Sequence, residues 1–305
     1  LDLFAENPTE DAVGSEFSSY ESLKTTPHDY QLIETEEDAR RICEKFTSSK
    51  ILVLDTETTS TNAIDAELVG LSFAIEEGKA FYVAIPNERE KAERIVNIFK
   101  PLYESTEILK IGQNIKYDME VLMNYGVRLA APMFDTMIAH YVLQPEQKHN
   151  MDTLAETLLH YQTIHIDELI GPKGKSQRNM RDLPPSAVCD YAAEDADVTL
   201  RLYNVLKPRL KEADVEELFY NIEMPLVPVL AEMEMNGVRL DTGALAETSK
   251  VLTERMQQIE QSIYELAGHE FNIASPKQVG EVLFGEMKIV EKPKKTKTGQ
   301  YVTSE

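Results

Sequence analysis

Apolar residues in the first two thirds of the chain form short runs that alternate with stretches of helical spacing. A run of about four to eight apolar residues between turn residues predicts a buried strand, and apolar recurrence every third or fourth position predicts an amphipathic helix. The predicted strands cover residues 51–54, 68–75, 80–85, 108–111 and 131–135. The predicted helices cover residues 36–45, 89–103, 115–125, 136–142 and 151–160. Three consecutive strands followed by alternating helices and strands indicate an α/β fold with a mixed sheet.

Beyond Pro184 the pattern becomes almost wholly helical. Long amphipathic stretches predict helices over residues 186–210, 216–235, 242–267 and 277–284. We therefore predict an α/β domain followed by a helical segment, with a boundary near residues 207–214.

Charge and composition limit the possible functions. The chain carries 53 acidic and 31 basic residues, a net charge of −22, so overall positive charge cannot attract nucleic acid. Eleven acidic and two basic residues lie in the first 40 positions, and we interpret residues 1–28 as a flexible linker. Two cysteines without metal-type spacing fit a reducing compartment. No signal peptide or membrane-spanning run is visible, so we expect a cytoplasmic protein without a membrane partner.

The first candidate site is Asp55-Thr56-Glu57, at the end of the apolar strand 51–54. Side chains alternate faces along a strand, so Asp55 and Glu57 point the same way. Two carboxylates on one face repel each other unless a cation lies between them, and Mg²⁺ prefers such oxygen ligands. The alternative is a solvated strand end, which is the commoner setting for acidic residues.

Two further motifs lie on predicted helices. Asn114 and Asp118 are four residues apart, as are Tyr191 and Asp195, so each pair shares a helix face. Alternatively, Asn114 serves only as an N-cap, and a helical tyrosine is more often part of the core. Asp197 points in another direction than Asp195, and we interpret it as a surface residue or as support for the site.

The three motifs together predict more than each one alone. Four converging carboxylates, from Asp55, Glu57, Asp118 and Asp195, are favourable only if they hold divalent metals. Two metals about 3.5–4 Å apart can clamp an in-line displacement at phosphorus, where one activates water and the other stabilises the leaving oxygen.

In this order the motifs resemble those of the proofreading 3′–5′ exonuclease domain of family A DNA polymerases. Asp135 in Phe134-Asp135-Thr136 and the stretch 151–156 also resemble that family. The segments 222–230 and 236–241 resemble the start of its polymerase domain.

The resemblance implies three parts. Residues 29–212 would form a ribonuclease-H-like exonuclease domain, and residues 213–305 a truncated thumb. Residues 1–28 would link to a preceding nuclease domain. The polymerase motifs are not found, and the chain lacks an initial Met, so we expect a piece of a longer polymerase that cannot synthesise DNA alone.

The resemblance also implies a role for each motif residue. Asp55, Glu57 and Asp195 would bind a first divalent metal, and Asp55 with Asp118 a second. Mg²⁺ is expected, with Mn²⁺ or Zn²⁺ as alternatives. Tyr191 would orient the attacking water. The implied reaction is hydrolysis of the terminal phosphodiester at a single-stranded or frayed 3′ end of DNA, which releases a nucleoside monophosphate.

Substrate contacts are implied at a second set of residues. Thr56, Gln113 and Asn114 would lie beside the terminal nucleotide. Thr61 stands where many relatives carry a leucine wedged against the terminal base, and Ile166 where another apolar contact, often Phe, is found. Base stacking contributes about 1–3 kcal/mol per base, so these departures should affect substrate affinity more than chemistry.

Basic residues gather at two places. A cluster before the third motif comprises Lys173, Lys175, Arg178 and Arg181. It forms either a solvated loop or contacts to the phosphates of the single strand. A second cluster, which by the resemblance would contact duplex DNA, comprises Lys292, Lys294, Lys295 and Lys297.

Two other functions compete with this one. A ribonuclease-D-like exonuclease acting on RNA would use the same carboxylates, although the polymerase-like segments argue against it. A non-catalytic DNA-binding scaffold would tolerate Thr61 and Ile166, although the complete carboxylate set argues against it.

Overall fold

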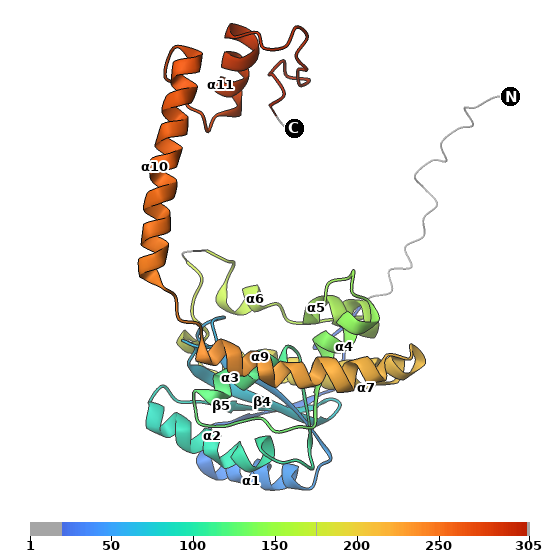
Figure 1. Cartoon of the computed structure of the whole chain (residues 1–305). Helices are drawn as coiled ribbons and strands as arrows, with labels where there is room; N and C mark the ends of the chain where they lie inside the picture. The colour runs from blue at the N-terminus through green and yellow to red at the C-terminus, as the bar shows by residue number, and fades with distance from the viewer. Residues whose placement is uncertain (1–19, 175, 304–305) are drawn as a thin grey trace, which may run out of the picture. The chain divides into compact units, whose positions relative to one another are not determined.

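The chain divides into two units by packing. The computed structural model describes residues 20–174 and 176–303, and the first unit ends at Gly237 while the second begins at Val238 (Figure 1). Residues 213–237, assigned above to the thumb, lie in the first unit because Phe219, Met224 and Val227 are buried in its core. The domain boundaries of the family remain a prediction.

A six-stranded mixed sheet forms the centre of the first unit, as predicted. Its strands are, in spatial order, β2 (Asp29–Ile33), β5 (Lys79–Ala84), β4 (Leu68–Glu76), β3 (Ile51–Thr58), β6 (Leu109–Gly112) and β7 (Met133–Asp135). β4 is antiparallel to both of its neighbours, whereas β3, β6 and β7 run parallel and β2 is parallel to β5.

Three short strands were not predicted. β2 has too few apolar residues in alternating positions for its pattern to predict a strand. β1 (Glu21–Ser22) and β8 (Tyr161–Gln162) are only two residues long each. β1 pairs in parallel with β8. Residues 1–19 of the predicted linker lie outside the described residues, but residues 20–28 contain β1 and a hydrogen-bonded turn, contrary to that prediction.

Helices cover both faces of this sheet (Figure 1). α1 (Glu36–Thr47) and α2 (Arg89–Tyr103) cover one face, where the rings of Phe46, Phe73 and Phe99 pack with centroids 4.7 to 5.8 Å apart. Leu54 lies opposite Phe73 in the β3–β4 register and therefore faces this layer. By alternation, Asp55 and Glu57 face the other layer, which α7 (Pro185–Glu212) crosses.

The remaining helices of the first unit connect or flank these layers. They are α3 (Ile115–Met123), α4 (Thr136–Leu143), α5 (Met151–Leu154), α6 (Ile166–Ile170), α8 (Glu216–Leu218) and α9 (Met224–Asn236). π-helical turns over Ala155–Leu159 and Phe219–Glu223 extend α5 and α8, and Met180–Asp182 forms a 3₁₀ turn.

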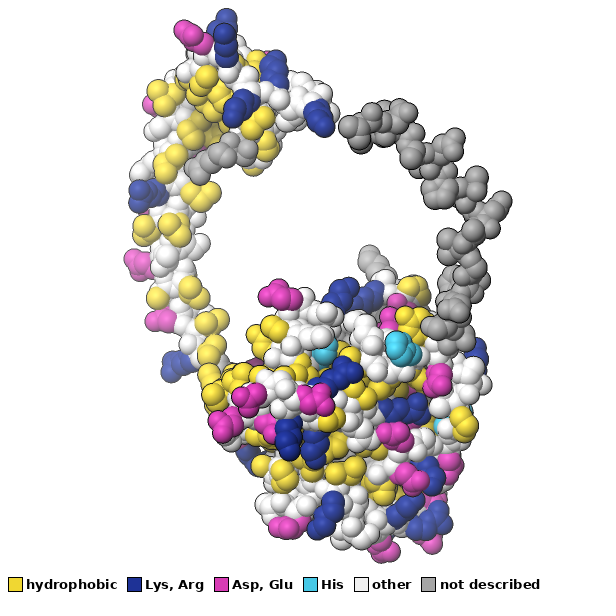
Figure 2. All heavy atoms as spheres, turned by 90° about the vertical axis from the view of Figure 1, so that its right-hand side faces the viewer, with side chains coloured by type: hydrophobic (Ala, Val, Ile, Leu, Met, Phe, Trp, Pro, Cys, Tyr) yellow, Lys and Arg dark blue, Asp and Glu magenta, His cyan; other side chains and the backbone are white. Residues whose placement is uncertain are grey.

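The second unit consists of α10 (Thr242–Ala267) and α11 (Pro276–Gly280), which continues as a π-helical turn over Glu281–Glu286. Apolar side chains are exposed along α10 (Figure 2). Of its large apolar side chains, that of Met256 is the most exposed but one, at 70%. Near the chain end, Lys295 bridges to Tyr301 and its ammonium lies 4.4 Å from that ring's centroid. None of the helices in residues 20–174 and 176–303 is both long and apolar enough to cross a bilayer.

The aromatic layer under α1 should carry much of the first unit's stability. Phe46 is fully buried, so Phe46→Ala leaves a large cavity and should lower the free energy of unfolding by about 3–5 kcal/mol. Urea unfolding followed by circular dichroism measures this change. Ile64→Ala is the control, because Ile64 is 56% exposed and its loss should cost less than about 0.5 kcal/mol. Equal losses for both variants would contradict the assignment of this core.

Candidate active site

Three carboxylates converge between β3 and α7. Asp55 and Glu57 project from β3 and Asp195 from α7, and one ligand oxygen of each lies within 4.8 Å of the other two. Glu57 Oε1 is buried and finds no hydrogen-bond donor in the part of the chain that the structure describes. A set of oxygen acceptors with an orphaned buried atom among them fits a divalent cation.

Burial raises the pKa of each carboxyl in this cluster, and repulsion from neighbouring carboxylates raises those of Glu57 and Asp195 further. Burial raises the pKa of Asp55 to about 6. The pKa of Glu57 is well above its usual range because of burial and then of Asp55. For Asp195, burial raises the pKa first, followed by Asp55 and Glu57. The surrounding protein therefore does not balance the negative charges of the ionised carboxylates. A bound cation would balance them.

Asp118 lies beside this cluster but is held by a separate contact. It is buried on α3, and its Oδ1 accepts a hydrogen bond of 2.7 Å from Thr56 Oγ1. Burial raises the pKa of Asp118 first, and the charge of Asp55 raises it further, so the two carboxylates interact. The structure thus gathers three of the four predicted carboxylates in one cluster and places the fourth next to Asp55. Thr56, whose side chain holds the Asp118 carboxylate, is itself only 8% exposed.

The carboxylate of Asp135 fixes the backbone that carries Asn114 and Asp118. It is buried at the end of β7 and accepts hydrogen bonds of 2.8 to 3.3 Å from the backbone N–H groups of Asn114, Ile115, Met137 and Ile138. It therefore caps α3 and α4 together. Asn114 has a left-handed backbone, with φ of 61°, and its side chain makes no capping bond, so the N-cap interpretation of that side chain is wrong.

Tyr191 stands one helical turn before Asp195 on α7. The Asp195 carboxylate, followed by burial, raises the pKa of Tyr191, so the phenol stays protonated and can donate a hydrogen bond. Below it, α7 packs on Tyr82, whose ring lies over Gly70. A Cβ at Gly70 would come within 2.0 Å of that ring, so only glycine fits opposite Glu57 in the register.

A cleft of about 670 Å³ opens beside Glu57. Predicted substrate residues in its wall are Thr56, Thr61, Asn114, Ile166 and Arg178. Lining residues that sequence reasoning missed include Tyr117, Ile170, Gln177, Asn179 and Met180. Tyr117 lies on α3 between the motif residues Asn114 and Asp118, whereas the other four come from α6, the loop after it and the 3₁₀ turn, where the sequence shows no motif. Asn179 joins two walls of the cleft, because its Nδ2 donates to the carbonyl of Thr59 at 2.9 Å.

Other predicted contacts lie outside the cleft. Gln113 donates to the His149 carbonyl at 2.8 Å and accepts from the Thr136 hydroxyl, so its amide is engaged within the protein. Lys173 is exposed and does not line the cleft, and Lys175 lies outside the described residues. Arg181 donates to the carbonyls of Leu68 and Ile85, so neither interpretation of the basic cluster holds for this residue.

The second basic cluster is exposed, whereas Asp197 is buried. The lysines of the second unit, Lys292, Lys294, Lys295 and Lys297, are all exposed, and their DNA contacts stay a prediction. Asp197 is fully buried, which excludes the surface interpretation.

Comparison with known proteins identifies two matching families. The family described as 3′–5′ exonuclease matches residues 30–211, and DNA polymerase family A matches residues 242–305. DNA polymerase I of Pseudomonas aeruginosa is 40% identical over 271 residues, which cover 86% of this chain and 30% of the relative. DNA polymerase I of Rhizobium leguminosarum is 36% identical over 311 residues, which cover 93% of this chain and 30% of the relative. The chain therefore spans less than a third of the length of these relatives.

Solved structures share the fold. The POL domain of Pol1 from M. smegmatis, in complex with DNA primer-template and dNTP, superposes with a TM-score of 0.71 at 23% identity, over 90% of this chain and 43% of that one. Brucella melitensis NrnC with bound Mg²⁺ superposes with a TM-score of 0.51 at 21% identity, over 70% of this chain and 95% of that one. These similarities confirm the predicted ribonuclease-H-like sheet flanked by helices.

Removing the Asp135 carboxylate should damage both stability and the site. Asp135→Ala leaves four backbone N–H groups without their acceptor, so we expect a loss of at least about 2 kcal/mol in the free energy of unfolding. Asp135→Asn keeps one acceptor oxygen and should lose about half as much. Chemical denaturation of both variants decides this, and equal stability of Asp135→Ala and the unmodified chain would exclude the double-cap role.

The raised carboxyl pKa values predict a pH-dependent stability of the metal-free protein. An unfolded Asp ionises near pH 4, so the stabilising contribution of Asp55 is fully present below about pH 4 and is lost as pH rises through about 6. In a chelator the thermal midpoint should fall between about pH 5 and about pH 8, and Mg²⁺ should restore it at the higher pH.

A charge-matched pair of variants isolates this effect from the general acidity of the chain. Asp195→Asn should raise the metal-free midpoint near pH 8, because it removes one charge from the cluster. Glu44→Gln removes one charge from an exposed site on α1 and should leave the midpoint unchanged. Equal shifts in differential scanning calorimetry would show that the cluster is not the source.

Proposed function

Because this chain belongs to the 3′–5′ exonuclease family of family A DNA polymerases, we propose that its carboxylate cluster removes nucleotides from the 3′ end of DNA. The observation that carries the proposal is the convergence of Asp55, Glu57 and Asp195, whose ligand oxygens lie within 4.8 Å of one another. In the proposed reaction, water adds to the terminal phosphorus and the bond to the preceding O3′ breaks. The products are a nucleoside 5′-monophosphate and a strand shorter by one nucleotide.

Asp55, Glu57, Asp118 and Asp195 would hold two divalent cations, with Mg²⁺ or Mn²⁺ as the proposed ions. Two such cations supply activation of water and stabilisation of the leaving oxygen. Glu57 Oε1 contributes the acceptor that has no protein donor among the described residues, and Thr56 keeps Asp118 in place.

Tyr191 supplies a hydrogen-bond donor at the same place. Its phenol is protonated beside Asp195, so it can hold the oxygen of the attacking water in line with phosphorus. The phenol is a positioning group in this proposal, because its raised pKa keeps it protonated and only the phenolate could act as a base.

The cleft beside Glu57 would receive the terminal nucleotide. Ile166, Ile170 and Met180 offer an apolar wall for a base, while Asn114 and Tyr117 offer polar groups for the sugar and phosphate. Arg178 stands exposed at the wall and anchors the loop through a hydrogen bond of 2.8 Å to the Leu169 carbonyl. Its remaining donors suit the phosphates of a single strand.

The family matches favour a DNA exonuclease over the two competing functions, an RNA exonuclease and a non-catalytic scaffold. A polymerase family match over residues 242–305 disfavours a ribonuclease-D-like enzyme, and the complete carboxylate set disfavours an inactive scaffold. We propose that the partners are a frayed or single-stranded 3′ end of DNA and the rest of a polymerase chain. The relatives are bacterial polymerases, so we place the protein in the bacterial cytoplasm.

Digestion of 5′-labelled single-stranded DNA tests the proposal. The unmodified chain with Mg²⁺ or Mn²⁺ should shorten the strand from its 3′ end, and a chelator should stop it. Asp55→Ala should lower the rate by about 1,000-fold or more, because it removes a ligand shared by both cations. RNA of the same sequence should be digested more slowly.

Asp190→Ala is the matched control on the helix that carries Asp195. Asp190 is exposed and is not part of the cluster, so this variant should digest DNA at the unmodified rate. If Asp55→Ala and Asp190→Ala are equally active, the site assignment is wrong.

A further inference from the structure

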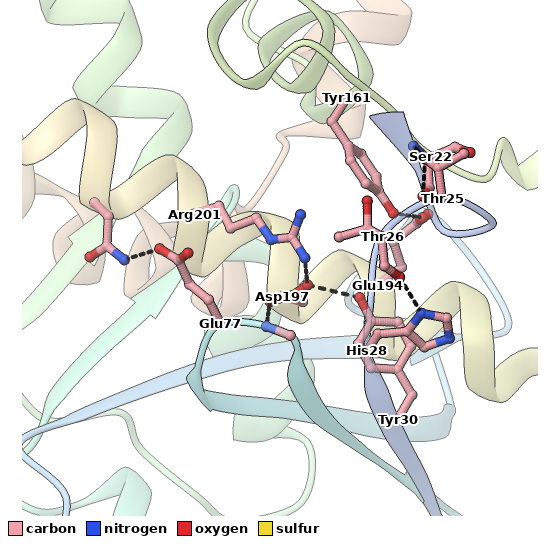
Figure 3. Close-up of polar contacts among 12 residues, drawn as sticks. Ser22, Thr25, Thr26, His28, Tyr30, Glu77, Tyr161, Glu194, Asp197 and Arg201 are labelled. Atoms are coloured by element: carbon pink, nitrogen blue, oxygen red, sulfur yellow. Dashed lines mark hydrogen bonds and ion pairs between the residues drawn. The ribbon is translucent and has the colours of Figure 1, made fainter. Parts of the chain in front are cut away.

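A polar network with buried acids links α7 to neighbouring segments through Glu194, Asp197 and Arg201 (Figure 3). At its centre Asp197, with no exposed surface, accepts hydrogen bonds from the Tyr30 hydroxyl at 2.9 Å, the Gly78 N–H at 2.6 Å and the Arg201 guanidinium at 2.5 Å. A buried carboxylate is tolerated only when it is paired and hydrogen-bonded in this way. All of its donors are therefore needed to keep it where it is.

The donors to Asp197 come from three separate parts of the fold. Tyr30 lies on β2 at the edge of the sheet, Gly78 lies in the turn between β4 and β5, and Arg201 lies on the next turn of α7. Asn204 adds a second bond to the same turn, because its Nδ2 donates to Glu77 Oε1 at 2.6 Å. The helix is thereby bonded to the sheet beyond Asp195.

A second buried acid holds α7 just before Asp195. Glu194 has no exposed surface and accepts hydrogen bonds from the Tyr161 hydroxyl at 2.7 Å and the Ile164 N–H at 2.6 Å. The Arg201 guanidinium lies 5.3 Å from the centroid of the Tyr161 ring, so the two anchors are joined. Asp195 is thus flanked by bonded residues on both sides.

Helix geometry turns these anchors into a constraint on the site. Successive residues are about 100° apart around a helix, so Glu194 and Asp197 point away from β3 while Asp195 points toward it. A side-chain carboxylate lies about 5–6 Å from the helix axis, so a rotation of about 10° moves it by about 1 Å. A misplacement of that size can cost about 100-fold in rate.

We infer that Asp197 is a positioning residue of the exonuclease, which sets the rotation of α7 and thereby the places of Asp195 and Tyr191. This inference rests on the proposed function. It also gives the segment before the family match a role, because β1 and the turn that leads to Tyr30 lie before residue 30, and β1 pairs with β8.

The test compares Asp197→Ala, Asp197→Asn and Tyr30→Phe in two assays on the full chain. Calorimetry with Mn²⁺ alone measures the affinity of the carboxylate cluster, and digestion of single-stranded DNA measures kcat and KM separately. Asp197→Ala should weaken Mn²⁺ binding by about 10-fold and lower kcat by about 10- to 100-fold, with KM changed by less than about twofold. Asp197→Asn keeps one acceptor oxygen, either for Gly78 at the Oδ1 position or for Tyr30 and Arg201 at the Oδ2 position, and should recover part of both losses.

Phe46→Leu is the control for general destabilisation, since Phe46 lies under α1 on the opposite face of the sheet. It should lower the thermal midpoint without changing kcat or Mn²⁺ affinity. If Asp197→Ala behaves like this control, the inference is overturned. If Asp197→Ala does not fold, Tyr30→Phe decides, with an expected loss of about threefold in Mn²⁺ affinity; no loss would overturn the inference.

The two proposals fail in different ways. A chain that binds Mn²⁺ but leaves DNA intact would refute the proposed function, while the dependence of Mn²⁺ affinity on Asp197 would still decide the inference. A chain that digests DNA at the same rate with and without the Asp197 carboxylate refutes the inference alone. A chain that binds no Mn²⁺ refutes both.

Discussion

Repulsion among buried carboxylates is the constraint on which the rest of this structure depends. Ligand oxygens of Asp55, Glu57 and Asp195 lie within 4.8 Å of one another; burial raises the pKa of each carboxyl, and the neighbouring charges raise those of Glu57 and Asp195 further. No protein cation among the described residues is bonded to the cluster, although arginine and lysine are bonded to acids elsewhere. Ionisation of these carboxylates is therefore unfavourable in the metal-free protein, and the arrangement suits the binding of divalent cations.

Hydrogen bonds to three other buried acids hold in place the helices that carry part of this cluster and of its surroundings. The Asp135 carboxylate accepts four backbone N–H groups and ties the starts of α3 and α4 to the end of β7. Asp197 and Glu194 bind α7 to β2, to the β4–β5 turn and to the segment after β8. Each of these three buried acids accepts hydrogen bonds from protein donors, whereas Glu57 Oε1 in the cluster has no donor among the described residues. This contrast distinguishes carboxylates that organise the backbone from those that are available as ligands for a cation.

The cleft shows a division between chemistry and recognition. The carboxylates stand on regular elements, β3, α3 and α7, which fix them to the core. The walls come partly from the segment 166–180, whose hydrogen bonds run to carbonyls such as those of Thr59 and Leu169. Under the proposed function, substitutions at Thr61 and Ile166 would therefore change contacts to a base without displacing the carboxylates that would hold the cations. The two units also differ in burial, because α10 has no buried residue, whereas α1, α2 and α7 of the first unit each bury apolar side chains.

The sequence by itself determined the mixed sheet, the faces of β3 and the convergence of the carboxylates of Asp55, Glu57 and Asp195. These follow from local rules, since alternation along a strand and the four-residue spacing on a helix hold wherever the segment lies. Only the tertiary structure decided that Asp118 is held by Thr56 instead of joining the other three, that Gln113 is engaged within the protein, and that Asp197 is buried. It also revealed β2 and the wall residues Tyr117 and Asn179. Each of these outcomes depends on partners far away in the chain, such as Tyr30 for Asp197, and spacing along a sequence carries no information about such distances.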